Sequence, residues 1–492
     1  MTENTLADPA EVLASLGVRD ALQAAGPGDA QPVYDPSTGR VLCEVPASGG
    51  TRVADTITAA AEAQRAWGRL PLADRIDMLA GLVGELVRRR SEFATLDALN
   101  SGNPLRACHF DVDDIVRYFQ HWSAMARTMQ LSRYGADFGA VHYDDPFPYG
   151  VVLRITAFNK PLYFAVGGAL MPLLMGNAVI VKPAPQTPLS AIAFAALAAR
   201  HLPPGLVSAV PGDVATAQAL ITSPAIRRIA FTGSAATGLA IQRSCAATGM
   251  VKHLTMELGG KNAIIVLPDV DLDAAADAVV RGSSFRTTQG QSCQATSRVL
   301  AHDDIHDSLL DRVSARLDVL RMGTAYDPST DVGPLVTAAH RERVRALVDS
   351  GLSLGATVRH QVTADTGGAG FYFTPLLLAD VEPSMTIAQE EIFGPVLTAT
   401  RVGSIQQAVD IANSVRYGLT AAVWSKDIDV ALSVASSLES GYVWVNDVAQ
   451  HYPGAPFGGV KDSGVGSEES SEALRSFTQQ RSIHVKLHTP SR

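Results

Sequence analysis

One cysteine stands where a reactive thiol would be expected. Cys293 lies in the segment Gln289-Gly-Gln-Ser-Cys293-Gln-Ala-Thr296, a glycine-containing run of small and polar residues, whereas structural cysteines usually have apolar neighbours. We therefore expect Cys293 to be accessible, and its thiolate could attack an electrophilic carbon. Because a lone cysteine is more often structural than catalytic, this interpretation needs partner residues elsewhere. Cys43, Cys108 and Cys245 are interpreted as structural.

Two other residues have the chemistry to assist a nucleophile. Glu257 lies between Met256 and Leu258, which can desolvate its carboxyl group, raise its pKa and suit it to general-base catalysis. The alternative is a surface glutamate paired with Lys261. Asn159 follows a strand expected over 151–155, and its amide could donate a hydrogen bond to an oxyanion. The alternative is an asparagine that turns the chain before a proline. Taken singly, these residues leave both alternatives open.

Alternating strands and helices are predicted around these residues. An order of strand, helix, strand, helix, strand is typical of a parallel sheet, whose ligands bind beyond the carboxyl ends of the strands. Strands are expected over 178–181, 206–210 and 228–231, and helices over 188–201, 214–221 and 238–247. A nucleotide site is the natural expectation for such a sheet.

Two strand ends in this run could hold the nucleotide. Lys182 follows the first strand, and Thr232-Gly233-Ser234-Ala-Ala-Thr-Gly238 joins the third strand to its helix. Glycines permit close backbone approach, and a helix N-terminus offers unpaired N–H groups to phosphate oxygens. The segment matches neither the GxGxxG fingerprint nor a P-loop. The alternative, that Gly233 and Gly238 serve only turns and helix packing, therefore stays open.

The remaining segments are predicted more coarsely. Apolar spacing predicts successive helices from 55 to about 130, including 74–90, and a second α/β region over 263–440 with a strand at 263–267 and helices at 339–350 and 405–414. An irregular or two-stranded excursion is expected over 132–150, and a strand in the tail from about 476. The apolar stretch 162–181 has the length of a membrane span, but its internal glycines and proline favour a buried helix, a turn and a strand.

Composition limits the function. The chain has 492 residues, about three domain lengths, with 40 Lys+Arg against 49 Asp+Glu, a net charge of −9. Without clustered basic residues, nucleic acid is not an expected partner. Four cysteines without CxxC spacing predict neither disulfides nor zinc, and no metal site is expected. The first twenty residues lack the pattern of a signal or transit peptide, so a cytoplasmic location is expected, without membrane association.

Seven motifs in a fixed order identify a family that the single residues do not. The sequence resembles the aldehyde dehydrogenase superfamily, in its NAD(P)-dependent non-acylating branch, over about residues 30–485. The motifs are Phe158-Asn-x-Pro161, Val181-Lys-Pro-Ala184, Phe231-Thr-Gly-Ser234, Met256-Glu-Leu-Gly-Gly-Lys261, Gly290-Gln-x-Cys293, Glu390-Glu-Ile-Phe-Gly-Pro395 and Pro456-Phe-Gly-Gly459.

The resemblance implies roles for individual residues. Cys293 would be the nucleophile, Glu257 the base that activates water, and Asn159, with the Cys293 backbone N–H, the oxyanion donor. The implied cofactor is NAD or NADP, with NAD favoured. Lys182 would contact the adenosine ribose, Ser234 the pyrophosphate and Glu391 the nicotinamide ribose, with Phe393 near the nicotinamide. The full set of expected cofactor residues is Thr156, Lys182, Gly212, Gly233, Ser234, Gly238, Leu258, Glu391 and Phe393.

Departures from the common family pattern concern cofactor choice and the aldehyde. Pro185 replaces a glutamate that in many members binds the ribose hydroxyls and repels a 2′-phosphate, which leaves NAD against NADP open. The interval from Glu257 to Cys293 is two residues longer than in many relatives, so the loop 285–289 is expected to be re-routed. The expected substrate-pocket residues are Lys160, Phe164, Gly167, Ser292, Gln294 and Phe457.

The predicted function is oxidation of an aldehyde to a carboxylic acid. Because Lys160 and Gly167 stand where many relatives have bulky aromatics, a medium or bulky substrate, aromatic or terpenoid, is expected. The alternatives are a coenzyme A-acylating enzyme, against which Glu257 counts, and a catalytically silent binding or structural member.

The resemblance also implies a domain plan. The predicted ranges are a Rossmann-like cofactor domain over 1–129 and 150–262, an α/β catalytic domain over 263–475 and a small β oligomerisation arm over 130–149 and 476–492. Edge-strand pairing by the arm predicts a homodimer or homotetramer.

Overall fold

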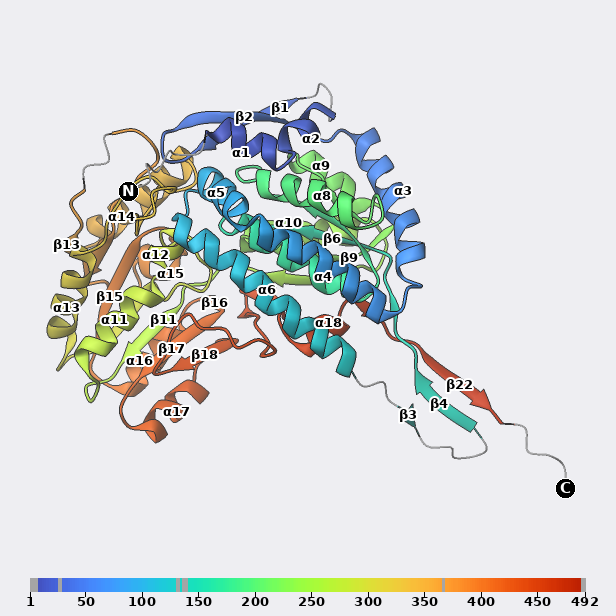
Figure 1. Cartoon of the computed structure of the whole chain (residues 1–492). Coiled ribbons are helices and arrows are strands. Elements are labelled where there is room, and N and C mark those ends of the chain that lie inside the picture. Colours follow the sequence, from blue (N-terminus) through green and yellow to red (C-terminus); the bar gives the residue numbers. More distant parts are fainter. Residues whose placement is uncertain (1–7, 25–28, 130–132, 135–139, 365–367, 488–492) are drawn as a thin grey trace.

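The computed structural model describes residues 8–24, 29–129, 133–134, 140–364 and 368–487. Figure 1 shows two α/β lobes side by side and an arm that projects from one of them with the C-terminal strand. The predicted α/β class is confirmed, since parallel strands form the body of both large sheets.

The first sheet has the strand order β20-β10-β9-β6-β7-β8. Its strands run parallel except β20, which is antiparallel to β10. The predicted alternation over 178–247 is confirmed, so the carboxyl ends of β6, β7, β9 and β10 share one edge. The strands are β6 Val151–Ile155, β7 Ala178–Lys182, β8 Val207–Ala209, β9 Ile226–Thr232, β10 His253–Glu257 and β20 Gly464–Val465.

Helices cover this sheet. One predicted start was wrong: the helix expected from Gly238 begins at Ala235, because the Ser234 hydroxyl accepts a hydrogen bond from Thr237 N–H and caps the helix earlier. The helices of this lobe are α1 Pro9–Ser15, α2 Val18–Ala24, α3 Gly50–Trp67, α4 Leu72–Arg88, α5 Arg90–Ser101, α6 Leu105–Thr128, α7 Gly168–Leu174 after a π-helical turn at Tyr163–Gly167, α8 Leu189–His201, α9 Val214–Thr222 and α10 Ala235–Ala247.

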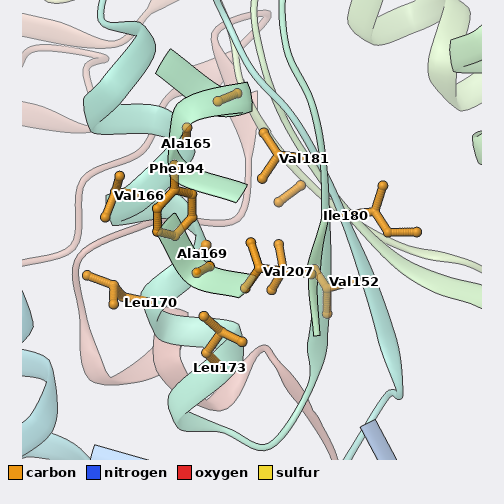
Figure 2. Packing of buried hydrophobic residues seen from close by; sticks show 14 of the residues in the cluster. Val152, Ala165, Val166, Ala169, Leu170, Leu173, Ile180, Val181, Phe194 and Val207 are labelled. Atoms are coloured by element: carbon orange, nitrogen blue, oxygen red, sulfur yellow. The ribbon is translucent and has the colours of Figure 1, made fainter. Parts of the chain in front are cut away.

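The apolar stretch 162–181 is core. Figure 2 shows its helical part, from Ala165 to Leu173, packed on the sheet strands with Phe194 of α8 between them. Leu170, Leu173 and Val181 are each at most 1% exposed. None of the helices in the described ranges is long and apolar enough to cross a membrane.

The second sheet has the order β13-β14-β15-β12-β11-β17-β18 and is parallel except for β13. Its strands are β11 Ala263–Val266, β12 Arg298–His302, β13 Thr357–Gln361, β14 Leu376–Ala379, β15 Val396–Val402, β17 Thr420–Trp424 and β18 Tyr442–Val445. Its helices are α11 Leu272–Gly282, α12 Phe285–Thr288, α13 His306–Asp318, α14 Ala338–Ser353, α15 Thr386–Gln389, α16 Ile405–Asn413 and α17 Ile428–Ser436.

After the second sheet the chain returns to the first. The pairing of β20 with β10, followed by α18 Ser471–Arg475 and the buried Phe477, places residues 464–477 against the first lobe. Arg228 of β9 donates to the Ser476 carbonyl at 3.0 Å and lies over the Phe477 ring. The predicted ranges put 464–475 in the catalytic domain, whereas these contacts join that segment to the cofactor side.

The arm brings two distant segments together. β22 Ser482–Lys486 pairs antiparallel with β4 Ala140–Asp144, which also pairs with β3 Arg133–Tyr134. Next to the body, β5 Phe147–Pro148 pairs with β21 Thr478–Gln479. The short-stranded excursion and the tail strand are therefore confirmed in the described residues, while predictions for 130–132, 135–139 and 488–492 lie outside them. Two small pairs complete the strands: β1 Ala30–Asp35 with β2 Arg40–Pro46, and β16 Tyr417–Gly418 with β19 Val460–Lys461.

Candidate active site

Two cavities meet at the predicted catalytic residues. One has a volume of about 520 Å³ and lies beyond the carboxyl ends of β6, β7, β9 and β10, and the other has a volume of about 530 Å³. The residues that line both are Asn159, Thr232, Glu257 and Cys293. Three of these, Asn159, Glu257 and Cys293, are the predicted catalytic residues, which lie up to 134 positions apart in the sequence. A group held at this junction can be reached from either cavity.

Cys293 is positioned by a strained and tightly bonded loop. Ser284 and Gln289, which flank α12, have φ angles of 58° and 54°, in the left-handed region that side chains rarely adopt. Gln289 donates to the Gly102 carbonyl at 2.9 Å, and Asn262 donates to the Cys293 carbonyl at 2.7 Å. The loop 285–289, for which re-routing relative to other family members is predicted, contains this short helix.

The Cys293 thiol is half-buried, so the predicted accessibility is partial. Burial raises the pKa of Cys293 to about 12, and the nearby carboxyl groups of Glu391 and Glu257 add to the rise. The thiol form therefore dominates at neutral pH in the protein alone. The residue can become a nucleophile only when a base removes the proton or positive charge is brought beside the sulfur.

Glu257 ends β10 and is 5% exposed. Neither of its carboxyl oxygens has a hydrogen-bond partner among the described residues, and the Lys261 ammonium likewise has none. The alternative of a surface Glu257–Lys261 pair is thus wrong. Burial raises the pKa of Glu257 well above its ordinary value, and Glu468 and Glu469 raise it further. A buried carboxyl group without partners is poised to exchange a proton with a small molecule that enters the junction.

Asn159 follows β6 and is 4% exposed. Its backbone carbonyl accepts a hydrogen bond from Asn103 at 2.7 Å, which holds the turn. Within the described part of the chain, its side-chain amide makes no hydrogen bond, although it lines both cavities. The amide is therefore free to donate to an oxygen placed at the junction, beside the thiol.

The first cavity collects most of the predicted cofactor residues. Ser234 caps α10, whose N-terminus faces the cavity, and Lys182 ends β7 at 5% exposed, where burial lowers its pKa to about 8. Lys182 donates only to the adjacent Pro183 carbonyl among the described residues. The predicted residues that line this cavity are Thr156, Lys182, Gly233, Ser234, Leu258, Glu391 and Phe393.

Two predicted cofactor residues do not line the cavity. Gly238 lies inside α10, where a Cβ atom would be 2.8 Å from the Leu258 side chain. Gly212 has a φ of 151°, and a Cβ there would be 2.2 Å from the Thr216 hydroxyl. Close packing therefore requires glycine at both positions, which agrees with the alternative left open for Gly238, and their cofactor role stays a prediction.

Glu391 is held beside the glycine pair at 259 and 260. It accepts a hydrogen bond from Gly260 N–H at 3.0 Å, and a Cβ atom on Gly259 would lie 2.4 Å from a Glu391 oxygen. Burial raises the pKa of Glu391 to about 7. The glycines are thus required because the carboxyl group lies directly against their backbone.

Phe393 is positioned by contacts that sequence reasoning missed. It has a φ of 58°, its carbonyl lies 2.7 Å from His340 Nε2, and its ring meets Phe158 edge-on at 5.5 Å. Burial lowers the pKa of His340 to about 4, so the imidazole is neutral. No spacing in the sequence indicates His340, because it lies in an ordinary first turn of α14.

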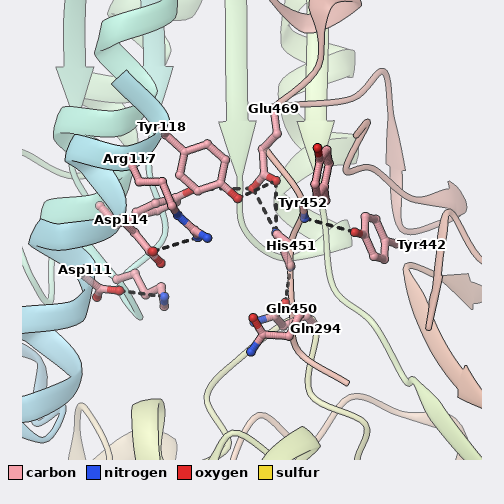
Figure 3. Close-up of polar contacts among 12 residues, drawn as sticks. Asp111, Asp114, Arg117, Tyr118, Gln294, Tyr442, Gln450, His451, Tyr452 and Glu469 are labelled. Atoms are coloured by element: carbon pink, nitrogen blue, oxygen red, sulfur yellow. Dashed lines mark hydrogen bonds and ion pairs between the residues drawn. The ribbon is translucent and has the colours of Figure 1, made fainter. Parts of the chain in front are cut away.

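All six predicted substrate-pocket residues line the second cavity: Lys160, Phe164, Gly167, Ser292, Gln294 and Phe457. The sequence missed a polar chain along one wall (Figure 3). His451 connects Gln294 to Glu469, and Tyr118 of α6 donates to the same carboxylate at 3.0 Å. Asp111, also of α6, is paired with Lys160 at 2.7 Å. The cavity therefore combines aromatic walls with buried polar groups.

The raised pKa values set the direction of the pH dependence. A group with a raised pKa is protonated at low pH, so Glu257 cannot accept a proton and Cys293 cannot attack there. Turnover of an aldehyde is expected to increase as pH rises from about 6 to about 9. The measurement is an initial-rate profile, with each sample also returned to one reference pH to separate titration from inactivation. A flat or falling profile would contradict this assignment.

The fold and the site define a two-lobed α/β enzyme in which a dinucleotide-type cavity and a second cavity meet at a cysteine. The aldehyde dehydrogenase family model matches residues 23–483. The chain is 37% identical to aldehyde dehydrogenase tropH of Talaromyces stipitatus over 92% of this chain and 89% of that protein, and 36% identical to retinaldehyde dehydrogenase 3 of Mus musculus over the same shares. The chain therefore belongs to the aldehyde dehydrogenase family and is an NAD(P)-dependent aldehyde dehydrogenase.

Solved structures agree. PnpE from Pseudomonas sp. WBC-3, in complex with nicotinamide adenine dinucleotide, superposes with a TM-score of 0.90 at 33% identity, covering 94% of this chain and 95% of that one. Betaine aldehyde dehydrogenase from Staphylococcus aureus, in complex with NAD⁺, gives a TM-score of 0.89 at 27% identity, covering 96% and 98%.

Proposed function

We propose that this enzyme oxidises a medium or bulky aldehyde, aromatic or terpenoid, to a carboxylic acid, with NAD favoured over NADP. The observation that carries the proposal is the meeting of two cavities of similar volume at Asn159, Glu257 and Cys293. One cavity suits a dinucleotide and the other an aldehyde, so both reactants reach the same sulfur from different sides.

The residues of the first cavity fit a dinucleotide. The capped N-terminus of α10 suits the pyrophosphate, Lys182 the adenosine ribose, and Glu391 and Phe393 the nicotinamide ribose and ring. Lys182 has donors to spare, and Gly233 and Gly259 also line this cavity. Bound NAD(P) would supply a two-electron hydride acceptor beside Cys293.

Cys293 and Asn159 carry the first half of the reaction. The Cys293 thiolate attacks the aldehyde carbon, forming a carbon–sulfur bond and moving the carbonyl electron pair onto oxygen. The resulting thiohemiacetal oxyanion accepts hydrogen bonds from the Asn159 amide and the Cys293 N–H. Loss of hydride from that carbon leaves a thioester on Cys293.

Glu257 carries the second half. Its ionised carboxylate takes a proton from water, and the hydroxide so formed attacks the thioester carbon. The carbon–sulfur bond breaks, the carboxylic acid leaves, and the thiolate returns to Cys293. The partner-free carboxyl oxygens of Glu257 leave room for that water.

Replacing Asn159 with alanine should lower kcat by about 10²–10³-fold, the usual effect of removing one oxyanion donor. Cofactor binding should be retained, because the cavity beyond Asn159 keeps its other residues. The measurement compares kcat and cofactor affinity with those of Asn413→Ala, an asparagine outside both cavities. An Asn159→Ala enzyme with wild-type kcat would remove Asn159 from the mechanism.

The choice of a medium or bulky aldehyde rests on cavity size and composition. A volume of about 530 Å³ falls in the range that holds drug-sized ligands. Gly167 leaves the wall open, with only the Tyr163 ring near its absent Cβ position, at 3.9 Å. Relatives named retinaldehyde dehydrogenase 3 and retinal dehydrogenase 2 support a bulky substrate by name.

Cofactor choice concerns the adenosine end of the first cavity. Pro185 lacks the carboxylate that would hold ribose hydroxyls, but Asp213 lines the same cavity, and a negative charge opposes a 2′-phosphate. Lys182 is the cation of this end. This balance supports NAD, which the NAD complexes of two structure neighbours also favour.

One assay separates the proposed function from its rivals. The absorbance of reduced nicotinamide is followed with a mixed aldehyde panel, with NAD or NADP, and with or without coenzyme A. Rates independent of coenzyme A, with free acid as product, support hydrolysis. Acyl-coenzyme A as the product would establish the acylating alternative. No turnover by a folded, cofactor-binding protein would establish the silent one.

The arm suggests how copies assemble. In the described residues β22 is an edge strand that pairs on one side only, with β4. Pairing of such an edge with a second copy would satisfy its free backbone groups and give a homodimer or homotetramer.

A further inference from the structure

The second cavity contains one ammonium group with hydrogen-bonding capacity left over. Lys160 Nζ donates to Asp111 at 2.7 Å and lies 5.3 Å from the centre of the Tyr163 ring. A lysine ammonium has three N–H donors, and no second acceptor lies within reach of Nζ among the residues that the structure describes. The side chain is 26% exposed and lines the cavity, so the remaining donors are available to a ligand there.

Apart from Glu257, which has no partner among the described residues, the other charged side chains that line the cavity are already ion-paired. Arg154 is paired with Glu468 at 2.7 Å, and Arg117 with Asp114 at 2.9 Å. The polar chain described above is satisfied internally, because Gln294, His451, Glu469 and Tyr118 bond to one another (Figure 3). Among the described residues that line the cavity, Lys160 is the only lysine, so it is the ammonium group that a substrate atom could satisfy.

Electrostatics decides which kind of atom that is. Asp111, Asp114 and Glu469 line the same cavity, and the charge of Lys160 is already balanced by Asp111. Each cation that lines the cavity is already ion-paired, so a carboxylate on the substrate would find no unbalanced positive charge there. A neutral oxygen accepts a charge-assisted hydrogen bond without adding charge. Burial lowers the pKa of Lys160, but Asp111 raises it to a net value above the ordinary one, so the group stays an ammonium and does not condense with the aldehyde.

Aromatic rings supply the rest of the binding surface. Phe457 stacks on His451 with ring centroids 4.3 Å apart, and His451 in turn stacks on Tyr442. Phe164 and Tyr163 meet edge-on at 5.7 Å on the side of Lys160. A flat ring placed between these groups would keep its faces against aromatic carbon, whereas a wholly apolar terpenoid chain would cover the Lys160 donors without replacing their water.

We infer that the enzyme prefers aromatic aldehydes that carry a neutral oxygen acceptor, such as a ring ether or hydroxyl, and that Lys160 donates the hydrogen bond that selects them. This inference rests on the proposed function and narrows its substrate class, because it chooses among the aromatic and terpenoid aldehydes.

The test compares substrates of equal shape. The kcat/KM values of meta- and para-methoxybenzaldehyde are each divided by those of the matching ethylbenzaldehydes, which have a methylene in place of the oxygen. We expect a wild-type ratio of about 10–100 at the better position, the effect of one hydrogen bond to a charged group. In Lys160→Met this ratio should fall by about the same factor of 10–100, to the ratio set by the intrinsic reactivity of the two aldehydes. Lys160→Arg should restore part of the wild-type ratio.

Controls keep the test decisive. Lys461→Met removes a lysine of equal exposure, 26%, that pairs with Glu439 outside both cavities, and its ratio should match wild type. The double variant Lys160→Met/Asp111→Asn avoids an unpaired buried carboxylate and should show the same lost selectivity. Equal ratios in wild type, Lys160→Met and Lys160→Met/Asp111→Asn would overturn the inference while leaving aldehyde oxidation intact. A wild-type enzyme that oxidises none of these aldehydes, or any other in the panel, would instead overturn the proposed function.

Discussion

Cys293→Ala should abolish aldehyde oxidation, with kcat reduced by at least about 10³-fold, because it removes the sulfur that forms the proposed covalent intermediate. The change removes one sulfur atom at the junction of the cavities and leaves the lining of the first cavity otherwise intact. The affinity for NAD should therefore change little. The measurements are steady-state rates and NAD binding by fluorescence, each on the folded variant.

The matched control is Cys43→Ala. Cys43 lies in β2, is half-buried like Cys293, and lies outside both cavities. Its replacement should leave turnover unchanged. If Cys293→Ala kept full steady-state activity, or if Cys43→Ala lost it to the same degree, the nucleophile would have to be sought elsewhere.

Glu257→Gln should slow the release of product while leaving the first half of the reaction in place. The amide has nearly the shape of the carboxyl group but cannot accept a proton from water, so the thioester should accumulate. We expect a burst of reduced cofactor of about one equivalent per subunit, followed by a steady rate reduced about 10²–10⁴-fold. Rapid mixing measures the burst, and intact-protein mass measures the acyl group on Cys293.

The same variant should also differ in stability, and the sign follows from the raised pKa of Glu257. In the wild type, folding favours the protonated form, so stability is lost as pH rises through the folded pKa. Glutamine does not titrate, so it is spared this loss. As pH increases, the free energy of unfolding of Glu257→Gln should therefore rise relative to that of the wild type. Glu439→Gln, an exposed glutamate, should show neither effect. Unchanged turnover without a burst would refute the role of Glu257.

Much of the first sheet could be predicted because local signals agreed there. The strands and helices over 178–247 alternate at short intervals, each bounded by glycine, proline or a capping residue. The start of α10 was placed wrongly because Gly238 was taken as the boundary, whereas the hydroxyl of Ser234 caps the helix. The return of 464–477 to the first lobe could not be predicted, since it depends on contacts such as Arg228 with Phe477 that link positions far apart in the chain.

The site residues likewise fall into those that a short sequence motif could place and those that only the folded chain brings together. Residues carried by short motifs, such as Cys293, Glu257 and Glu391, could be placed from sequence because each motif holds its own turn. His451, Glu469 and Asp111 could not, since they come from separate segments and meet only across the second cavity. Gly212 and Gly238, which the resemblance assigns to the cofactor, do not line the first cavity, and close packing already requires glycine at both positions.

The two cavities share only four lining residues, so the walls of one cavity can change in evolution without changing the walls of the other. Substitution of Lys160, Gly167 or Gln294 can change the range of aldehydes that bind while the lining of the cofactor cavity stays the same. The converse holds for Pro185 and Asp213. Aldehyde specificity and cofactor specificity can therefore diverge independently, with the same residues kept at the junction around Cys293.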